Sequence, residues 1–296
     1  MALTSPTVII IVGPTAVGKT AAAVRLARHF KTKIVSADSR QCYRELNIGV
    51  AKPSPAELAA VHHYFINSHS IETEVSAATF EELALGYVDT IFKTSPVAVM
   101  VGGTGLYIRA FTDGLDTIPP VDQSIRSQIR HDYEEHGLSW LQAEIRKYDP
   151  EFAQQGEIQN PQRVMRALEV RMSTGQSILS FRTREPRQRS FAIKTIGLQL
   201  PKEELHRRIH QRVDDMMAAG LLEEVKSLLP WRRHNALQTV GYRELFDYLD
   251  GKHTLEQAVD AIKTNTRQYA KRQLTWFRRD LSVRWADPAT PVENLL

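Results

Sequence analysis

The residues best suited to chemistry lie near the amino terminus, in the run Gly13-Pro14-Thr15-Ala16-Val17-Gly18-Lys19-Thr20. The run fits the spacing G-x-x-x-x-G-K-[ST] of a P-loop, and it stands between an apolar segment and a helical one, as that motif requires. In such a loop the backbone N–H groups surround a phosphate, Lys19 neutralises it, and the Thr20 hydroxyl can ligate Mg²⁺. The alternative is a glycine turn with an incidental lysine. The complete match favours a polyphosphate site.

A carboxylate follows the next apolar segment. Residues Lys33–Ala37 predict a strand beside the P-loop strand, so Asp38 stands at a carboxyl end, where open α/β sheets bind ligands. From position alone, Asp38 is either a catalytic or metal-binding carboxylate or an Asx-turn that caps the strand. An ordinary nucleotide hydrolase would also carry an acid after the apolar segment 97–101, but Gly102-Gly103 stands there, and the D-x-x-G and N-K-x-D tetrads of GTPases are absent.

The elements that position these residues alternate between strand and helix. Buried strands are predicted at 7–12, 33–37, 97–101, 191–200 and 283–286, and helices at 19–30, 77–93, 202–219 and 255–277. This order predicts an α/β fold with a P-loop NTPase-like parallel sheet flanked by helices. From about residue 118 only helical spacing is found, for roughly seventy residues, which is long for a connection. We therefore predict a catalytic core of residues 1–117 and 190–296, interrupted by an all-helical insertion at 118–189.

Composition limits the class of protein. Of the 296 residues, 42% are apolar and 24% are charged, which is the globular range. The single cysteine, Cys42, cannot form an internal disulfide, so we expect a reducing compartment. No apolar run approaches the roughly twenty residues of a membrane span, and the run Val8–Val12 is too short for a secretory signal. We expect a cytoplasmic protein with no membrane attachment.

The modest net charge of +4 conceals two basic windows. Residues 160–192 carry seven arginines, including Arg163, Arg166, Arg184 and Arg189, for a net +5, and residues 263–284 carry a net +6. The second window interleaves Tyr269, Trp276 and Phe277 with its basic residues, the mixture that binds phosphates and stacked bases of single-stranded RNA. Each window alone could be a solvated face, but together with a P-loop they favour RNA contact.

Two further residues are candidates for substrate binding. Arg208 and Arg212 both border a helical stripe formed by Leu205, Ile209 and Val213, and we favour Arg212 as a phosphate ligand. The alternative for Arg212 is a solvated position or a salt bridge to a neighbouring carboxylate. In the loop after residue 101, Thr104 could donate a hydrogen bond to a phosphate or to a base.

Taken together, these motifs resemble those of the tRNA dimethylallyltransferases, over nearly the whole chain. The matching stretches are Gly13–Thr20, Asp38-Ser39-Arg40-Gln41, Ile48–Pro53, Gly102–Tyr107, Gln162–Val170, Gly241–Glu244 and Thr266–Phe277. Two departures from the family pattern are Val17, where serine is expected, and Val50, where threonine is expected. Neither position is assigned to chemistry.

The resemblance implies a reaction in which the P-loop holds the diphosphate of dimethylallyl diphosphate. The exocyclic amine of adenosine 37, next to the tRNA anticodon, attacks the allylic carbon and diphosphate leaves. By resemblance Asp38 is the base that takes the amine proton. Thr15, Lys19, the loop amides and Mg²⁺ on Thr20 would stabilise the leaving group.

The resemblance also assigns the tRNA surface. The residues expected to contact tRNA are Asp38, Ser39, Arg40, Gln41, Arg163, Arg166, Lys271, Arg272 and Gln273, and the enzyme is expected to act as a monomer. A rival with the same P-loop and Asp38 is an adenylate isopentenyltransferase that uses free nucleotide, and it has no need for the basic insertion. A nucleotide kinase or ATPase is a third possibility, against which the missing strand-end acid argues.

Overall fold

The computed structural model describes residues 5–183 and 185–295, and the strands among them form one parallel sheet. The strand order is β3-β2-β4-β1-β5-β6, with β1 paired to β4 on one side and to β5 on the other. The bounds are β1 Thr7–Val12, β2 Ile34–Ser36, β3 His63–Tyr64, β4 Val97–Val101, β5 Ala192–Leu198 and β6 Arg284–Ala286. The predicted α/β class with a parallel sheet is confirmed. The predicted strand 33–37 is β2, but it pairs with β3 and β4, so the prediction that it lies beside the P-loop strand β1 is wrong: the chain crosses over and places β4 between them.

The described chain divides into two compact units, residues 5–113 with 188–295 and residues 114–187. The first unit contains the whole sheet. Its helices are α1 Lys19–His29, α2 Pro55–Ala60, α3 Ala77–Phe92, α4 Gly105–Asp113, α8 Lys202–Ala218, α9 Leu221–Ser227, α10 Tyr242–Leu249, α11 Leu255–Phe277 and α12 Val292–Leu295, with short 3₁₀ turns at Leu229–Trp231 and Asn235–Leu237.

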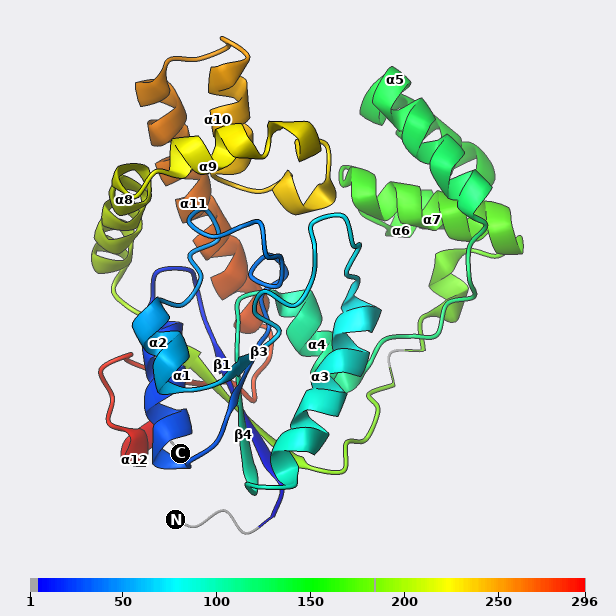
Figure 1. Ribbon diagram of the computed structural model, residues 1–296. Helices are drawn as coiled ribbons and strands as arrows, with labels where there is room; N and C mark the ends of the chain where they lie inside the picture. Colours follow the sequence, from blue (N-terminus) through cyan, green and yellow to red (C-terminus); the bar gives the residue numbers. More distant parts are fainter. Residues whose placement is uncertain (1–4, 184, 296) are drawn as a thin grey trace. The chain divides into compact units, whose positions relative to one another are not determined.

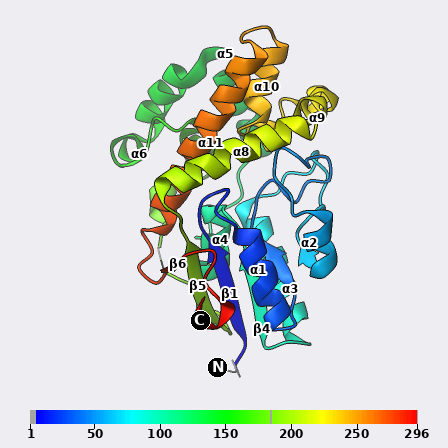
Figure 2. The same cartoon turned by 90° about the vertical axis from the view of Figure 1, so that its left-hand side faces the viewer.

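Helices cover both faces of the sheet (Figures 1 and 2). Successive residues of β1 point to opposite faces, as the pleat of a strand requires. Ile9 and Ile11 pack with α1, α8 and α12, whereas Val8 and Ile10 pack with α3 and α4. All six residues of β1 are buried, because β1 is a central strand covered on both faces. The first unit therefore places the carboxyl ends of its strands at one edge, where the P-loop lies.

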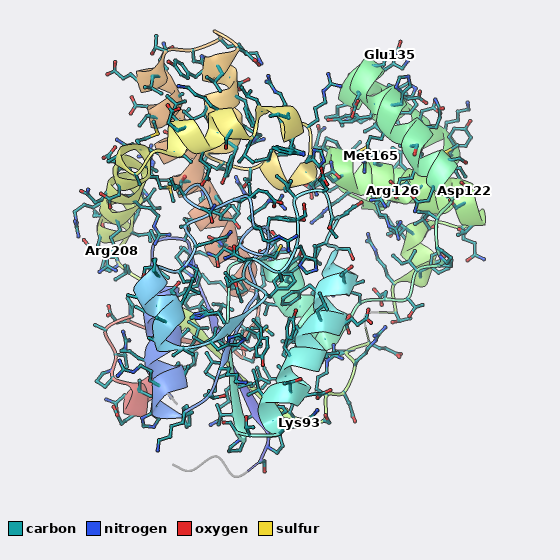
Figure 3. All side chains as sticks on the ribbon, in the orientation of Figure 1. Lys93, Asp122, Arg126, Glu135, Met165 and Arg208 are labelled. Carbon is teal, nitrogen blue, oxygen red and sulfur yellow. The ribbon has the colours of Figure 1, made fainter. Side chains whose placement is uncertain are left out.

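Helices are the regular secondary structure of the second unit among its described residues. It consists of α5 Gln123–Tyr148, α6 Pro150–Gln155, α7 Pro161–Thr174 and a 3₁₀ turn at Ile178–Phe181. Gly137, with φ +73, interrupts α5, so the helix has a kink there. Met165 of α7 belongs to the unit's own apolar core, and Arg126 of α5 forms an ion pair with Glu169 of α7 (Figure 3).

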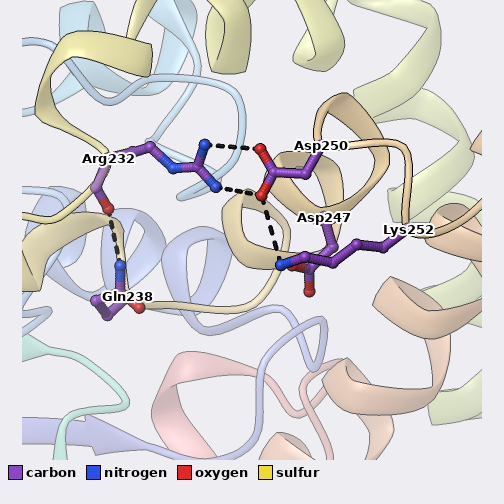
Figure 4. A network of polar contacts seen from close by, with 5 residues as sticks. All are labelled: Arg232, Gln238, Asp247, Asp250 and Lys252. Atoms are coloured by element: carbon purple, nitrogen blue, oxygen red, sulfur yellow. Dashed lines mark hydrogen bonds and ion pairs between the residues drawn. The ribbon is translucent and has the colours of Figure 1, made fainter. Parts of the chain in front are cut away.

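A polar network fixes the loop that joins α9 to α10 (Figure 4). The Arg232 guanidinium donates two hydrogen bonds to the Asp250 carboxylate, at 2.8 and 2.7 Å. The Lys252 ammonium contacts both Asp247, at 2.7 Å, and Asp250, at 3.4 Å. Gln238 donates to the carbonyl oxygen of Arg232 at 2.8 Å. A bidentate arginine pair inside such a network orders a loop better than isolated surface pairs do.

Several elements were not predicted from the sequence, among them β3, α4, α6 and α12. Strand β3 has two residues and pairs only with β2, which is too short for an apolar pattern to be recognised. Helix α4 begins directly after the glycine-rich loop that follows β4, where the glycines lower helix propensity. Among the described residues, no helix is long and apolar enough to cross a membrane.

Candidate active site

The P-loop joins β1 to α1 through backbone conformations that favour glycine. Gly13 has φ +142, and a Cβ atom there would lie 2.6 Å from the carbonyl oxygen of Leu198, at the end of β5. Gly18 has φ +102 and precedes α1, which begins without a side-chain cap. The first N–H groups of α1 are therefore left for an anion, at the positive end of the helix dipole.

Two cations converge on this loop. Lys19 donates from Nζ to the carbonyl oxygen of Pro14 at 2.8 Å, and Arg212 of α8 donates to the Thr15 hydroxyl at 3.3 Å. Burial, and to a lesser extent the positive charge of Arg212, lower the pKa of Lys19 to about 7, against the opposing effect of Asp38. Burial also lowers the pKa of Arg212. A half-buried pair of like charges favours binding of a polyanion, which would relieve their repulsion and desolvation.

The two arginines of α8 have different environments. Leu205, Ile209 and Val213 are buried as the stripe predicted. Arg208, labelled on α8 in Figure 3, donates to Glu204 at 2.7 Å, and its side chain is 40% exposed. Arg212 instead reaches the P-loop. A salt bridge to a neighbouring carboxylate, the alternative considered for Arg212, is thus made by Arg208, one helical turn earlier.

Asp38 lies after β2 and uses one carboxylate oxygen for a turn. Its Oδ1 accepts hydrogen bonds from the backbone N–H groups of Arg40, at 2.9 Å, and Gln41, at 3.3 Å. The Asx-turn considered from the sequence is therefore present. The other oxygen, Oδ2, takes part in no hydrogen bond among the described residues. Asp38 lines the same cavity as the P-loop. The turn fixes the carboxylate while leaving one oxygen for a ligand.

The loop after β4 packs directly on the segment that carries Asp38. A Cβ atom at Gly102 would lie 2.1 Å from the carbonyl oxygen of Ala37, so only glycine fits. The Thr104 hydroxyl accepts a hydrogen bond from the backbone N–H of Ser39 at 3.0 Å and donates to the Ser39 hydroxyl at 3.3 Å. Thr104 therefore positions the Asp38-Ser39 segment, and its predicted contact with substrate stays a prediction.

Gln273 of α11 joins two loops of the site. Its Oε1 accepts from the backbone N–H of Thr15 at 2.8 Å, and its Nε2 donates to the carbonyl oxygen of Gly103 at 3.0 Å. The residue is 6% exposed. We predicted a tRNA contact for Gln273, and the structure places its amide between the P-loop and the 102–105 loop. Its neighbours Lys271 and Arg272 are exposed on the same helix.

Gln41, another predicted tRNA contact, is also engaged within the protein. Its Nε2 donates to the carbonyl oxygens of Val50, at 3.3 Å, and Ala51, at 3.0 Å, and its Oε1 accepts from the Ser36 hydroxyl at 3.3 Å. Arg40 donates to the carbonyl oxygen of Ser39 at 3.3 Å and is half-buried. Any contact of Gln41 with a base would replace or share these bonds.

These residues surround one cavity of about 720 Å³. It is lined by the P-loop, Asp38 and Gln41, by residues of the 47–54 segment, by Arg212, Met216 and Ala219, and by Tyr269 and Gln273 of α11. The Arg272 guanidinium lies 5.8 Å from the centre of the Tyr269 ring. The volume is suited to a small diphosphate ester together with part of a second substrate.

The expectation that Thr20 binds Mg²⁺ can be compared with the side chains available as metal ligands. Thr20 lines the cavity in the first turn of α1. Among the described residues, no group of three or more His, Cys, Asp or Glu side chains could hold a metal ion. Mg²⁺ commonly keeps several waters and is bound by one or two protein groups plus substrate phosphates. The residues present fit that kind of binding and not a preformed protein cage.

The basic windows include structural arginines as well as exposed ones. In the second unit, Arg163 pairs with Glu157 at 2.8 Å and Arg166 pairs with Glu169 at 3.3 Å, with both arginine side chains about half exposed. In the first unit, Arg189 donates to Glu81 at 2.8 Å and to backbone carbonyls of α4, and its side chain is 11% exposed. Arg189 is therefore no surface contact for RNA. Arg184 lies outside the described residues.

Comparisons with known proteins identify the family of this chain. Residues 41–280 match the family model described as IPP transferase. The chain is 48% identical to the tRNA dimethylallyltransferase of Christiangramia forsetii, over 93% of this chain and 91% of that protein. It is 46% identical to tRNA dimethylallyltransferase 1 of Bacteroides thetaiotaomicron, over 98% and 94%.

Solved structures give the same result. The full-length tRNA isopentenylpyrophosphate transferase of Bacillus halodurans aligns with a TM-score of 0.71 at 36% identity, covering 98% of this chain and 93% of that one. A eukaryotic dimethylallyltransferase acting on tRNA aligns with a TM-score of 0.76 at 26% identity, covering 96% and 74%. Since the family match spans most of the chain and the relatives align over nearly its whole length, the chain belongs to the IPP transferase family.

Proposed function

We propose that this protein transfers a dimethylallyl group from dimethylallyl diphosphate to the exocyclic N6 amine of adenosine 37 in tRNA and releases diphosphate. The observation that carries the proposal is the convergence of Lys19 and Arg212 on the P-loop in the cavity that also contains the Asp38 carboxylate. Phosphate-binding groups and a base then face one space. The names of the relatives, tRNA dimethylallyltransferases, support the choice of substrates.

The diphosphate of the donor would bind at the P-loop. Its negative charge would be held by loop N–H groups, by Lys19 and by Arg212, with the Thr15 hydroxyl beside them. The same groups act on the reaction itself, because charge accumulates on diphosphate as the allylic C–O bond breaks. Removing one such preorganised donor costs on the order of 10²–10³ in rate.

The adenine amine needs a base because its lone pair is conjugated with the ring. As N6 forms its bond to the allylic carbon, the C–O bond to diphosphate breaks and the N6 proton moves to Oδ2 of Asp38. The Asx-turn at Oδ1 keeps the carboxylate in place during that transfer. A positioned base of this kind contributes about 10²–10⁴-fold.

Mg²⁺ would be held by the Thr20 hydroxyl together with the donor's phosphates, and when bound it would supply positive charge against the diphosphate. The acceptor adenosine must leave the stack of the anticodon loop to reach the cavity. Lys271 and Arg272 in the first unit, and Arg163 and Arg166 in the second, are the exposed cations proposed to hold the tRNA backbone. We propose that the protein acts as a monomer in the cytoplasm.

One experiment tests the acceptor. Radiolabelled dimethylallyl diphosphate is offered in parallel to unmodified tRNA, AMP and ATP, and label is expected in tRNA alone. Label in AMP or ATP would show an adenylate isopentenyltransferase. Hydrolysis or phosphoryl transfer from ATP, without prenyl transfer, would show a P-loop kinase or ATPase and would refute the proposal.

A further inference from the structure

A carboxylate outside the reaction is bound by the backbone of a segment that lines the cavity. Oε2 of Glu224, on α9, accepts hydrogen bonds from the N–H groups of Asn47, at 3.2 Å, and Ile48, at 2.7 Å. Its Oε1 accepts from the N–H of Gly49 at 3.0 Å. Three successive amides therefore converge on one carboxylate, an arrangement that favours an anion.

A buried tyrosine completes this site. The Tyr242 hydroxyl donates to Oε1 of Glu224 at 2.6 Å, and the Tyr242 side chain is fully buried at the start of α10. Burial and the Glu224 charge raise the pKa of Tyr242, so its hydroxyl stays protonated and acts as a donor. A Cβ atom at Gly49 would lie 2.6 Å from the Tyr242 ring, which shows how closely the segment approaches α10. Glu224 thus accepts four hydrogen bonds.

The other side of the segment faces the cavity. The cavity is lined by Asn47, Ile48, Val50, Ala51, Lys52 and Pro53 of the segment, and also by Met216 and Ala219 at the end of α8. Gln41 holds the carbonyl oxygens of residues 50 and 51, and Lys52 donates to the carbonyl oxygen of Tyr43 at 2.6 Å. These bonds fix the later half of the segment, whereas Glu224 accepts from the N–H groups of residues 48 and 49 in its earlier half.

We propose that Glu224 is a positioning residue that holds the segment Asn47–Pro53 as a wall of the cavity and thereby sets the affinity for the prenyl donor. This inference rests on the proposed function for the identity of the donor. Besides Asn47 and Lys52, the wall presents the apolar side chains of Ile48, Val50, Ala51 and Pro53, which suit an allylic hydrocarbon beside the diphosphate. Glu224 contacts no reacting atom; it acts through the backbone of residues 47–49.

The chemistry of the side chain predicts what its replacement does. In Glu224→Gln one of the two acceptor oxygens becomes an NH₂ group, which cannot accept from an N–H group. At least one backbone amide or the tyrosine hydroxyl then loses its partner, and the segment opens. If the ordered segment is populated only one time in ten, the apparent dissociation constant of the donor rises about tenfold while turnover of bound donor is unchanged.

The test compares Glu224→Gln with the matched control Glu223→Gln. Glu223 is the preceding residue of α9, its side chain is 71% exposed, and it pairs only with Lys226 in the described structure. Hydrogen exchange is measured on the ligand-free proteins, and KM for dimethylallyl diphosphate and kcat are measured with saturating tRNA. We expect Glu224→Gln to speed amide exchange in peptides covering residues 47–53 and to raise the donor KM by about tenfold or more, with kcat within threefold. Glu223→Gln should match the wild type in both.

Tyr242→Phe is the second variant, because it keeps the ring and removes one donor to Glu224. It should change exchange and KM in the same direction by a smaller factor. Unchanged donor KM in Glu224→Gln, or a fall in kcat and thermal stability with no change in KM, would overturn the inference by showing a structural role only. Failure of the wild-type protein to prenylate tRNA would instead overturn the proposed function, since the exchange measurement does not depend on it.

Discussion

The charge of Lys19 should make donor binding depend on pH above neutrality. In the ligand-free protein its pKa is about 7, because burial and Arg212 outweigh Asp38. The bound diphosphate requires the ammonium form. At pH 8 about nine in ten molecules must therefore take up a proton on binding, and the donor dissociation constant should rise about fiftyfold between pH 7 and pH 9.

Two variants should move this dependence in opposite directions. Arg212→Gln removes a positive charge that lowers the pKa of Lys19, so the rise in dissociation constant should begin at a higher pH. Asp38→Asn removes the negative charge that raises it, so the rise should begin at a lower pH. The informative quantity is the pH at which the dissociation constant begins to rise, and not its absolute value, because Arg212→Gln also weakens binding at every pH.

Calorimetry with dimethylallyl diphosphate in the absence of tRNA measures binding without reaction. Repeating the titration in two buffers with different ionisation enthalpies gives the number of protons taken up, which should approach one at pH 8. Lys93→Met, at an exposed residue after α3 (Figure 3), is the control and should behave as the wild type. Binding of equal strength at pH 7 and pH 9, with no proton uptake, would refute the assignment of Lys19 to the diphosphate.

Four other changes test the remaining roles. Asp38→Asn should lower single-turnover prenyl transfer by about 10²-fold or more with tRNA affinity within a few-fold, and near-normal rates would remove it from the chemistry. Arg163→Ala with Arg166→Ala should raise the tRNA KM and reduce the log–log salt slope of tRNA binding by roughly one per lost phosphate contact, whereas an identical slope would indicate a solvated face. Gln273→Glu should weaken donor binding about tenfold or more in calorimetry, because its carboxylate would face both the P-loop and the Gly103 carbonyl. Lys19→Met should raise the melting temperature of the ligand-free protein at pH 7, since the unfolded lysine binds its proton more tightly than the folded one; an unchanged or lower value would contradict this.

Features encoded by neighbouring residues could be predicted from the sequence. The central strands are continuous apolar runs, so β1 and β4 were predicted with their bounds. The P-loop spacing predicted the turn that leads into α1, because its glycines adopt conformations that other residues rarely adopt. Helical periodicity placed Arg212 at the border of a buried stripe, but it did not distinguish Arg212 from Arg208, because both border that stripe.

The partners of the site's polar side chains could not be predicted, because they are far apart in the sequence. The amide of Gln273 meets Thr15, 258 positions earlier, and Glu224 meets Ile48, 176 positions earlier. A glutamine in a basic helix and a glutamate in an amphipathic helix have the residue types of a solvated face, so nothing local marks either one as part of a site. What determines their role is the unpaired backbone N–H groups of two loops, which must find acceptors once the fold brings them near α11 and α9. Such positioning residues are therefore found by asking which acceptor each backbone N–H group of a folded loop uses. Residue type alone does not reveal them.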